Sequence, residues 1–228
     1  MKNHLKAIAV PKTWPIDRKK NVYITRPKPG THKLYFGMPL GVILRDFLHL
    51  TSTIREAGKL LNNNELLVDG KRVKDTRAIV GLFDAISIPN TKQNFRILLD
   101  KKGRLTIHEI DAKESKIKPC KVINKTILPK GKIQINLYDG RNITSDQKCA
   151  VGDTVVFDTT KNTISTVLEL KPGVLIFLTQ GKHAGNVGEL VELNGEKAIC
   201  KLNGENIETT KKYLFVLGEK KPVIKLME

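Results

Sequence analysis

Two Asn-Gly pairs stand nine residues apart near the end of the chain, and alternating apolar and polar residues flank each of them. Asn194-Gly195 and Asn203-Gly204 suit the positive φ angles of a two-residue hairpin turn. The spacing predicts a tight three-stranded meander over residues 187–208. Strands this short usually close into a small barrel, which removes exposed sheet edges.

The β pattern extends upstream of the meander. Residues 95–100 and 105–108 form a candidate hairpin, and residues 133–137 alternate with a period of two. We therefore expect a β-rich central domain over residues 93–170 and a C-terminal β unit over residues 171–228.

Helical spacing is confined to residues 39–62. Pro39 suits the first turn of a helix that continues to His49. Thr53 and Glu56 form a capping box, in which each side chain bonds to a free backbone N–H, so a second helix is predicted to begin there. The run Asn62-Asn63-Asn64 ends it, because asparagine tolerates the left-handed backbone of a helix C-cap.

Short strands follow the second helix. Residues 66–68 and 71–74 flank Asp69-Gly70, a pair typical of a tight hairpin turn. Residues 80–88 are predicted to form one closing strand bounded by Pro89. Together with the helices, these strands define a small domain over residues 38–92.

Charge indicates the kind of partner. Lys and Arg total 40 against 23 Asp and Glu, which gives a net charge of +17 and a pI of about 9.8. Such a chain binds polyanions by neutralising phosphates and releasing counterions. Nearly half of the excess lies in the first 34 residues, so we predict a basic, proline-rich N-terminal arm over residues 1–37 that becomes ordered on RNA. Trp14 either stacks on a base or packs against the folded body.

Motifs for other chemistry are missing from the sequence. The cysteines Cys120, Cys149 and Cys200 have no Cys-x-x-Cys spacing, and the five histidines have no metal-ligand spacing. No P-loop, dinucleotide fingerprint or serine-nucleophile elbow occurs, and no apolar run approaches the roughly 20 residues of a membrane span. We therefore predict a cytoplasmic protein that is not an enzyme, with no cofactor, no metal, no small-molecule substrate and no membrane partner.

The second helix and the hairpin are predicted to share one basic surface. Arg55 and Lys59 are four residues apart and so lie on one helix face. The hairpin and the loop after it add four cations: Lys71, Arg72, Lys74 and Arg77. Folded RNA is recognised mainly through its shape, phosphates and 2′-hydroxyls, which suits cations on a rigid support. The alternative is solvated charge around an ordinary hairpin.

Residues 54–62, 67–75 and 80–86 resemble the α-L RNA-binding motif. That motif is named after small-subunit ribosomal protein four and also occurs in pseudouridine synthases, a tyrosyl-tRNA synthetase tail and heat-shock RNA binders. The resemblance implies binding to structured RNA without specifying which RNA.

Residues 181–191 resemble the KOW motif of ribosomal proteins and transcription elongation factors. Gly181, Gly185 and Gly188 form its Gly-x-x-x-Gly-x-x-Gly core, which permits a tight loop and close backbone approach to phosphates. Lys182 and His183 are placed to reach RNA from that loop. The alternative is a glycine-rich barrel turn without a ligand.

The order of these segments resembles one family along essentially the whole chain, the e-type small-subunit ribosomal protein four of archaea and eukaryotes. Residues 4–14, Pro27-x-x-Gly-x-His32, Asn94-Phe-Arg96 and Asp100-x-Lys-Gly-Arg104 match that family. The chain ends at Glu228 without the longer basic tail of eukaryotic members, which favours an archaeal source.

The resemblance implies an α+β, mostly β protein: a basic arm (1–37), an α-L module (38–92), a β-rich central domain (93–170) and an SH3-like KOW barrel (171–228). It implies a structural constituent of the small ribosomal subunit that binds ribosomal RNA, contacts neighbouring ribosomal proteins and supports translation. The alternatives are an RNA-modifying enzyme or a transcription factor that uses the same modules. The candidate RNA-binding residues are Lys2, Lys6, Lys12, Trp14, Arg18, Lys19, Lys20, Arg26, Lys28, His32, Lys33, Arg55, Lys59, Lys71, Arg72, Lys74, Arg77, Lys182 and His183.

Overall fold

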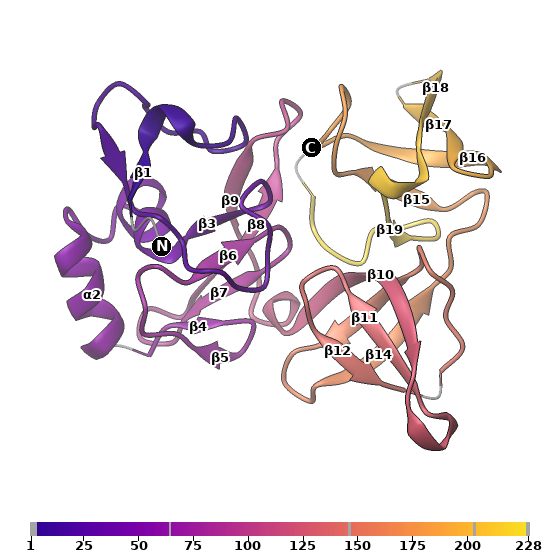
Figure 1. Ribbon diagram of the computed structural model, residues 1–228, viewed down its shortest axis with the longest axis horizontal. Coiled ribbons are helices and arrows are strands. Elements are labelled where there is room, and N and C mark those ends of the chain that lie inside the picture. The colour runs from indigo at the N-terminus through magenta and orange to yellow at the C-terminus, as the bar shows by residue number, and fades with distance from the viewer. Residues whose placement is uncertain (1–3, 64, 146, 203, 227–228) are drawn as a thin grey trace. The chain divides into compact units, whose positions relative to one another are not determined.

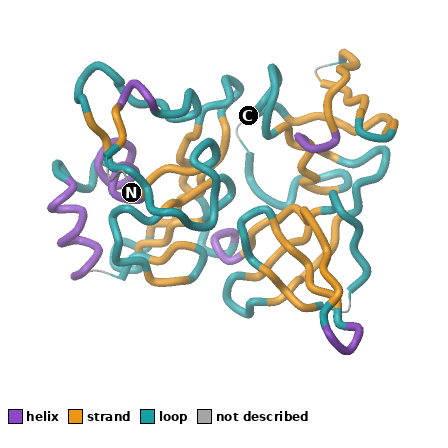
Figure 2. Tube along the Cα trace, in the orientation of Figure 1, coloured by secondary structure: helices purple, strands orange, loops and turns teal. Residues whose placement is uncertain are grey.

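The computed structural model describes residues 4–63, 65–145, 147–202 and 204–226. The chain divides into two compact units, of which unit 1 contains residues 1–98 and 104–116 and unit 2 contains residues 99–103 and 117–228. Strands outnumber helices in both units, so the chain is mostly β (Figures 1 and 2). The four-segment division made from the sequence is finer than these two units and stays a prediction.

The described residues of unit 1 form one five-stranded antiparallel sheet, in the order β5-β4-β7-β8-β9, and two pairs, β1-β2 and β3-β6. Its elements in chain order are β1 (Leu5–Lys6), η1 (Ala7–Ala9), β2 (Tyr23–Ile24), β3 (Gly37–Pro39), α1 (Leu40–Val42), η2 (Ile43–Phe47), α2 (Ile54–Asn63), β4 (Leu67–Val68), β5 (Lys71–Arg72), β6 (Ile79–Gly81), β7 (Ala85–Ile88), β8 (Gln93–Leu99), β9 (Leu105–Glu109) and η3 (Glu114–Lys116). The predicted hairpin at residues 95–108 is confirmed as β8 and β9, and it extends the sheet that contains β7.

The capping box of α2 is confirmed. Thr53 Oγ1 accepts the Glu56 N–H at 3.2 Å, and Glu56 Oε2 accepts the N–H groups of Thr53 at 3.3 Å and Ser52 at 2.8 Å. The two backbone hydrogen bonds lower the pKa of Glu56 below its usual value of 4.5. The helix then buries Ala57 and Leu61 against unit 1.

This arrangement predicts that Glu56 stabilises α2 only in its charged form. Because the pKa is lower in the folded chain, the contribution is present above the unfolded value of 4.5 and is lost as the pH falls through the folded pKa. We expect Glu56→Gln to melt below the wild-type chain at neutral pH and to match it near pH 3. Thermal melts across that range measure this, and a difference between the two chains that does not change with pH would contradict it.

The Asp69-Gly70 hairpin turn is also confirmed. Asp69 and Gly70 have φ angles of 48° and 75° between the paired strands β4 and β5. The buried Asp69 carboxylate accepts the Ala85 N–H at 3.0 Å, which fixes the turn to β7.

Two sequence predictions in unit 1 were wrong in detail. The first helix is the short α1 followed by the π-helical turn η2, in which Leu48 N–H donates to Ile43 O at 3.0 Å. Residues 80–88 are two strands instead of one. The chain reverses at Phe83, with φ at 67°, so that β6 pairs with β3 while β7 pairs with β4 and β8.

In unit 2, the part of the chain that the structure describes forms two five-stranded antiparallel sheets, β12-β11-β10-β13-β14 and β18-β17-β16-β15-β19. Its elements in chain order are β10 (Ile117–Ile127), η4 (Pro129–Gly131), β11 (Ile133–Leu137), β12 (Asn142–Thr144), β13 (Thr154–Asp158), β14 (Thr163–Leu168), β15 (Leu175–Leu178), β16 (Val187–Asn194), β17 (Lys197–Leu202), β18 (Glu205–Thr210), η5 (Lys211–Tyr213) and β19 (Leu214–Gly218).

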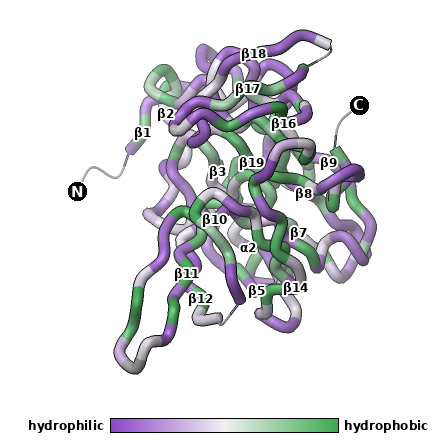
Figure 3. The backbone as a smooth tube through the Cα atoms, turned by 90° about the vertical axis from the view of Figure 1, so that its right-hand side faces the viewer, coloured by the Kyte–Doolittle hydropathy of each residue, from purple (hydrophilic) through white to green (hydrophobic). Residues whose placement is uncertain are grey.

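Each sheet of unit 2 has its own apolar core, and the hydrophobic segments follow the strands in Figure 3. The first core contains Cys120, Val122, Ile135 and Phe157, and the second contains Ile176, Leu190, Ala198 and Val216. The predicted meander is confirmed, because β16 pairs with β17 and β17 with β18. Asn203 itself lies outside the described residues.

Lys121 links the two sheets of unit 2. It lies on β10, and its Nζ donates to the carbonyl oxygens of Lys212 at 3.0 Å and Leu214 at 2.7 Å, where η5 meets β19. Burial of the side chain lowers the pKa of Lys121 to about 8. This lysine therefore serves the packing of unit 2.

Candidate nucleic-acid interface

The α2 helix and the β4–β5 hairpin display a group of exposed cations. Arg55 and Lys59 lie on the exposed face of α2, and Lys71 and Lys74 are exposed on and after the hairpin. Arg72 is more constrained, because its guanidinium donates to Asn62 O at 3.4 Å and lies 3.7 Å from Glu65 Oε1. Arg72 thus joins the hairpin to the C-terminal end of α2. Together with Arg77 from the following loop, these cations form what we call the helix–hairpin surface: Arg55, Lys59, Lys71, Arg72, Lys74 and Arg77.

The loop after β5 brings two N-terminal cations to this part of unit 1. Arg77 Nε donates to Arg26 O at 3.0 Å, and Lys28 N–H donates to Arg77 O at 2.8 Å. The Lys28 ammonium pairs with the Asp75 carboxylate, and this hydrogen bond lowers the pKa of Asp75. Residues from the predicted arm therefore lie beside Arg77 in the folded unit.

A basic hollow lies near the start of the chain. It encloses about 450 Å³ and is lined by Lys12, Arg18 and Arg104, together with Trp14, Pro15 and Ile16. Its described lining includes no carboxylate. A backbone hydrogen bond from Leu105 N–H to Thr13 O, at 2.8 Å, holds Arg104 against the N-terminal segment. Arg104 was not among the predicted contacts, because only the fold brings it next to Lys12.

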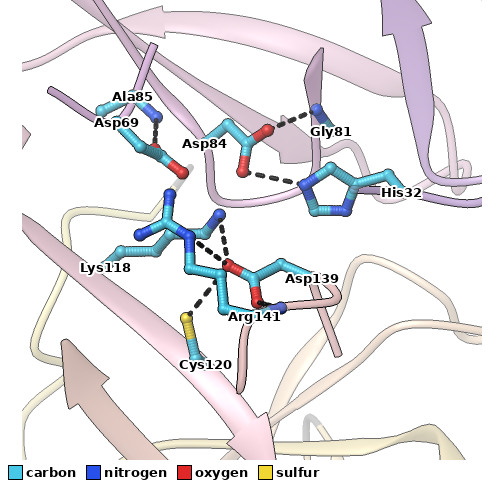
Figure 4. Close-up of polar contacts among 9 residues, drawn as sticks. All are labelled: His32, Asp69, Gly81, Asp84, Ala85, Lys118, Cys120, Asp139 and Arg141. Atoms are coloured by element: carbon cyan, nitrogen blue, oxygen red, sulfur yellow. Dashed lines mark hydrogen bonds and ion pairs between the residues drawn. The ribbon is translucent and has the colours of Figure 1, made fainter. Parts of the chain in front are cut away.

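Two predicted contact residues are buried. Trp14 is only 2% exposed, and its indole N–H donates to Leu34 O at 3.2 Å, which favours packing over base stacking. His32 Nε2 lies 2.9 Å from Asp84 Oδ1, and Asp84 also accepts the Gly81 N–H, as Figure 4 shows. These two side chains stabilise unit 1 in this structure.

The remaining N-terminal cations lie on the surface. The exposed ones are Lys6, Lys19, Lys20 and Lys33. Lys2 lies outside the described residues.

In unit 2, two other basic side chains point inward. Lys118 Nζ lies 3.0 Å and Arg141 Nε 3.2 Å from Asp139 Oδ2, and the Cys120 thiol donates to the same oxygen (Figure 4). Lys118 and Asp139 are almost fully buried, so their pairing satisfies two charges inside the protein.

The glycine-rich loop of residues 181–185 packs on the turn formed by residues 100–103. A Cβ on Gly185 would stand 2.0 Å from Asp100 O, and one on Gly188 would stand 2.6 Å from Lys201 O. These two glycines therefore allow their own segments to lie close to other protein backbone. Lys182 is exposed and His183 half-buried on the loop, and the turn adds the exposed Lys101 and Lys102, which sequence reasoning missed.

Within the described ranges no three His, Cys, Asp or Glu side chains gather as metal ligands would, and no described helix has the length and apolar character of a membrane span. The three cysteines are buried and form no disulfide with one another, and burial raises the pKa of Cys200 to about 11.

Known proteins resemble this chain along most of its length. The model of the RS4NT (NUC023) domain matches residues 1–35, and that of Ribosomal family S4e matches residues 91–164. The small ribosomal subunit protein eS4 of Methanosphaera stadtmanae is 38% identical, over 99% of this chain and 96% of that protein. Its counterpart in Nanoarchaeum equitans is 41% identical, over 85% and 83% respectively. The crystal structure of 30S ribosomal protein S4e from Thermoplasma acidophilum superimposes with a TM-score of 0.71 at 28% identity, over 82% of this chain and 98% of that one.

Proposed function

The chain belongs to the S4e family of ribosomal proteins, and from that membership we propose that it is a structural constituent of the small ribosomal subunit that binds ribosomal RNA. The observation that carries this proposal is that the likeness to small-subunit eS4 proteins covers nearly the whole chain. A single shared RNA-binding module would not produce likeness of that extent. The proposed place of action is the cytoplasm, within the small subunit.

We propose that residues 38–92 act as an α-L RNA-binding module and residues 171–228 as an SH3-like KOW barrel. The helix α2 followed by the β4–β5 hairpin supports the first assignment, and the β16–β18 meander after the glycine-rich loop supports the second. Residues 1–37 would form the basic arm and residues 93–170 the β-rich central domain. Neighbouring ribosomal proteins are the other proposed partners.

The exposed cations supply the proposed mechanism. Lysine and arginine side chains on the helix–hairpin surface neutralise RNA phosphates and release counterions, which favours binding most at low salt. The 450 Å³ hollow with Lys12, Arg18 and Arg104 accepts a phosphate without a described carboxylate to repel it. Because the contacts are covalently joined in one chain, each raises the effective concentration of the others.

The alternatives, an RNA-modifying enzyme and a transcription factor, are not favoured. The relatives are small ribosomal subunit proteins, and this chain matches them over almost their full length. An enzyme of that kind also needs a sizeable catalytic domain, and the residues after the α-L segment are occupied by the strands of the two units.

Sucrose-gradient fractionation of native extract tests the proposal. We expect the protein to migrate with the small ribosomal subunit and to stay there through a high-salt wash, because the covalently joined contacts must all be released together before the protein dissociates. Ribonuclease treatment before loading is the control, and it should move the protein to the top of the gradient. Migration at the top without ribonuclease, or with RNA polymerase, would overturn the proposal.

A further inference from the structure

Unit 1 contains a second hollow, of about 510 Å³, between the N-terminal segment and the η2–α2 connection. Its lining includes Lys20, Asn21, Tyr23, Arg45, His49 and Thr51. Hollows of roughly 300–1,000 Å³ hold small organic groups when a few polar atoms converge on them. Three features of this hollow indicate what it binds.

The first feature is an exposed aromatic ring. Tyr23 lies on β2 and is 56% exposed, although tyrosine side chains usually bury most of their ring. The His4 ring meets it nearly perpendicularly, at 5.6 Å between centroids and 82° between planes. Among the described residues, no aromatic ring stacks face to face on Tyr23. Its cross-strand partner, Lys6, adds an exposed cation beside it.

The second feature is a hydroxyl group without a protein partner. Thr51 Oγ1 is buried in the wall of the hollow, and no described residue hydrogen-bonds to it. A buried hydroxyl can both donate and accept, and leaving it unpaired costs about 1–3 kcal/mol. A ligand that enters the hollow and pairs with this oxygen would recover that free energy.

The third feature is that the two carboxylates of the hollow are already engaged. Asp46 accepts from Arg45 through both oxygens, Nε to Oδ1 at 2.7 Å and a terminal nitrogen to Oδ2 at 2.8 Å. Asp17 Oδ1 accepts the Lys19 N–H at 3.0 Å. The acids are thus occupied within the protein, while the Lys20 ammonium is exposed and available to a phosphate.

We infer that this hollow takes one unpaired nucleotide of the bound RNA. Tyr23 stacks on its base, Thr51 hydrogen-bonds the edge of that base, and Lys20 contacts the adjoining phosphate. Proteins that bind RNA in a sequence-dependent way commonly hold splayed-out bases on aromatic rings in this manner. The inference rests on the proposed function, because the nucleotide belongs to the ribosomal RNA.

The test is binding of the full chain to a transcript of small-subunit ribosomal RNA over a range of salt concentrations. Stacking is worth about 1–3 kcal/mol per base, so Tyr23→Ala should weaken binding by about 5- to 150-fold. The slope of log affinity against log salt should stay unchanged, because no phosphate contact is lost. Tyr23→Phe keeps the ring and should bind like the wild-type chain.

Tyr35→Ala is the matched control. Tyr35 is also exposed, at 41%, makes a similar edge contact with Phe36, and does not line the hollow. We expect it to retain wild-type affinity, and circular dichroism should show both alanine variants folded. Wild-type affinity in Tyr23→Ala, or an equal loss in Tyr35→Ala, overturns the inference while leaving salt-dependent RNA binding, and so the proposed function, intact.

Two further measurements define the ligand. Thr51→Val removes the hydroxyl but not the volume, and it should weaken RNA binding by about 2- to 10-fold without lowering the melting temperature. Unchanged affinity in this variant overturns the assigned base contact.

Equilibrium dialysis with free nucleoside monophosphates should show at best millimolar binding, since one stacked base scarcely offsets the cost of association. Micromolar binding would instead make a free nucleotide the ligand and overturn the inference.

Discussion

Replacing Arg55, Lys59, Lys71 and Arg72 together with glutamine should weaken binding to small-subunit ribosomal RNA by about 10²- to 10³-fold near 0.15 M salt. Each phosphate contact contributes a slope of about −0.7 to −0.9 to log affinity against log salt, so the loss of four contacts should make the slope shallower by about 2.8–3.6. Arg55, Lys59 and Lys71 are exposed and form no ion pair with another described residue, which leaves them available to phosphates. Filter binding over a salt series measures both quantities.

A control with the same change of charge separates local contact from general attraction. Four exposed lysines outside the proposed surfaces serve this purpose: Lys92, Lys148, Lys161 and Lys201. Their replacement with glutamine should alter the affinity much less. If both quadruple variants lose affinity equally, or if the slope of the first variant stays at its wild-type value, the helix–hairpin surface is not a set of phosphate contacts.

Arg72 has two roles within that set, because it is a proposed phosphate contact and also holds the hairpin in place. Its hydrogen bond to Asn62 O and its approach to Glu65 link the β4–β5 hairpin to α2. Comparing the triple variant of the other residues with the quadruple variant shows how much Arg72 adds by positioning the hairpin. The sequence does not reveal the positioning role of Arg72, because there it is one cation among several.

Local patterns in the sequence predicted the elements whose geometry depends on a few adjacent residues. The capping box at Thr53 and Glu56 and the Asp69-Gly70 turn involve only short-range bonds, so the residue types determine them. Both of these predictions were confirmed. The Asn194-Gly195 pair correctly predicted a tight reversal between β16 and β17 but not its residues, because Asn194 pairs with Lys197 and the two turn residues are Gly195, with φ at 62°, and Glu196.

Elements determined by long-range contacts were harder to predict. The strand β10 was missed because an inward-facing lysine, Lys118, interrupts the apolar alternation, and its pairing with Asp139, 21 residues further along the chain, makes that buried position tolerable. The split of residues 80–88 likewise depends on the turn at Phe83 and on the carboxylate of Asp84. The hollow with Tyr23 and Thr51 joins residues 28 positions apart, so no local pattern indicates it.

Gly185→Ala should destabilise unit 2 by at least about 3 kcal/mol and lower its melting temperature by about 6–12 °C. Gly185 has a φ of 89°, a region that side chains with a Cβ rarely adopt, and the added carbon would stand 2.0 Å from Asp100 O. The clashing oxygen belongs to the backbone, so the clash is relieved only if residues 100–103 and 181–185 move apart. Thermal melts of the full chain, followed by a probe in unit 2, measure the effect.

Gly195→Ala is the matched control for that experiment. Gly195 also has a positive φ, 62°, but no atom lies within 4 Å of its added Cβ, so only the backbone strain of about 1–2 kcal/mol applies. The difference between the two variants therefore isolates the contact between the glycine-rich loop and the turn that carries Lys101 and Lys102. Equal melting temperatures would mean that the loop moves away from Asp100 without cost, and the close packing would then have no part in holding these cations together.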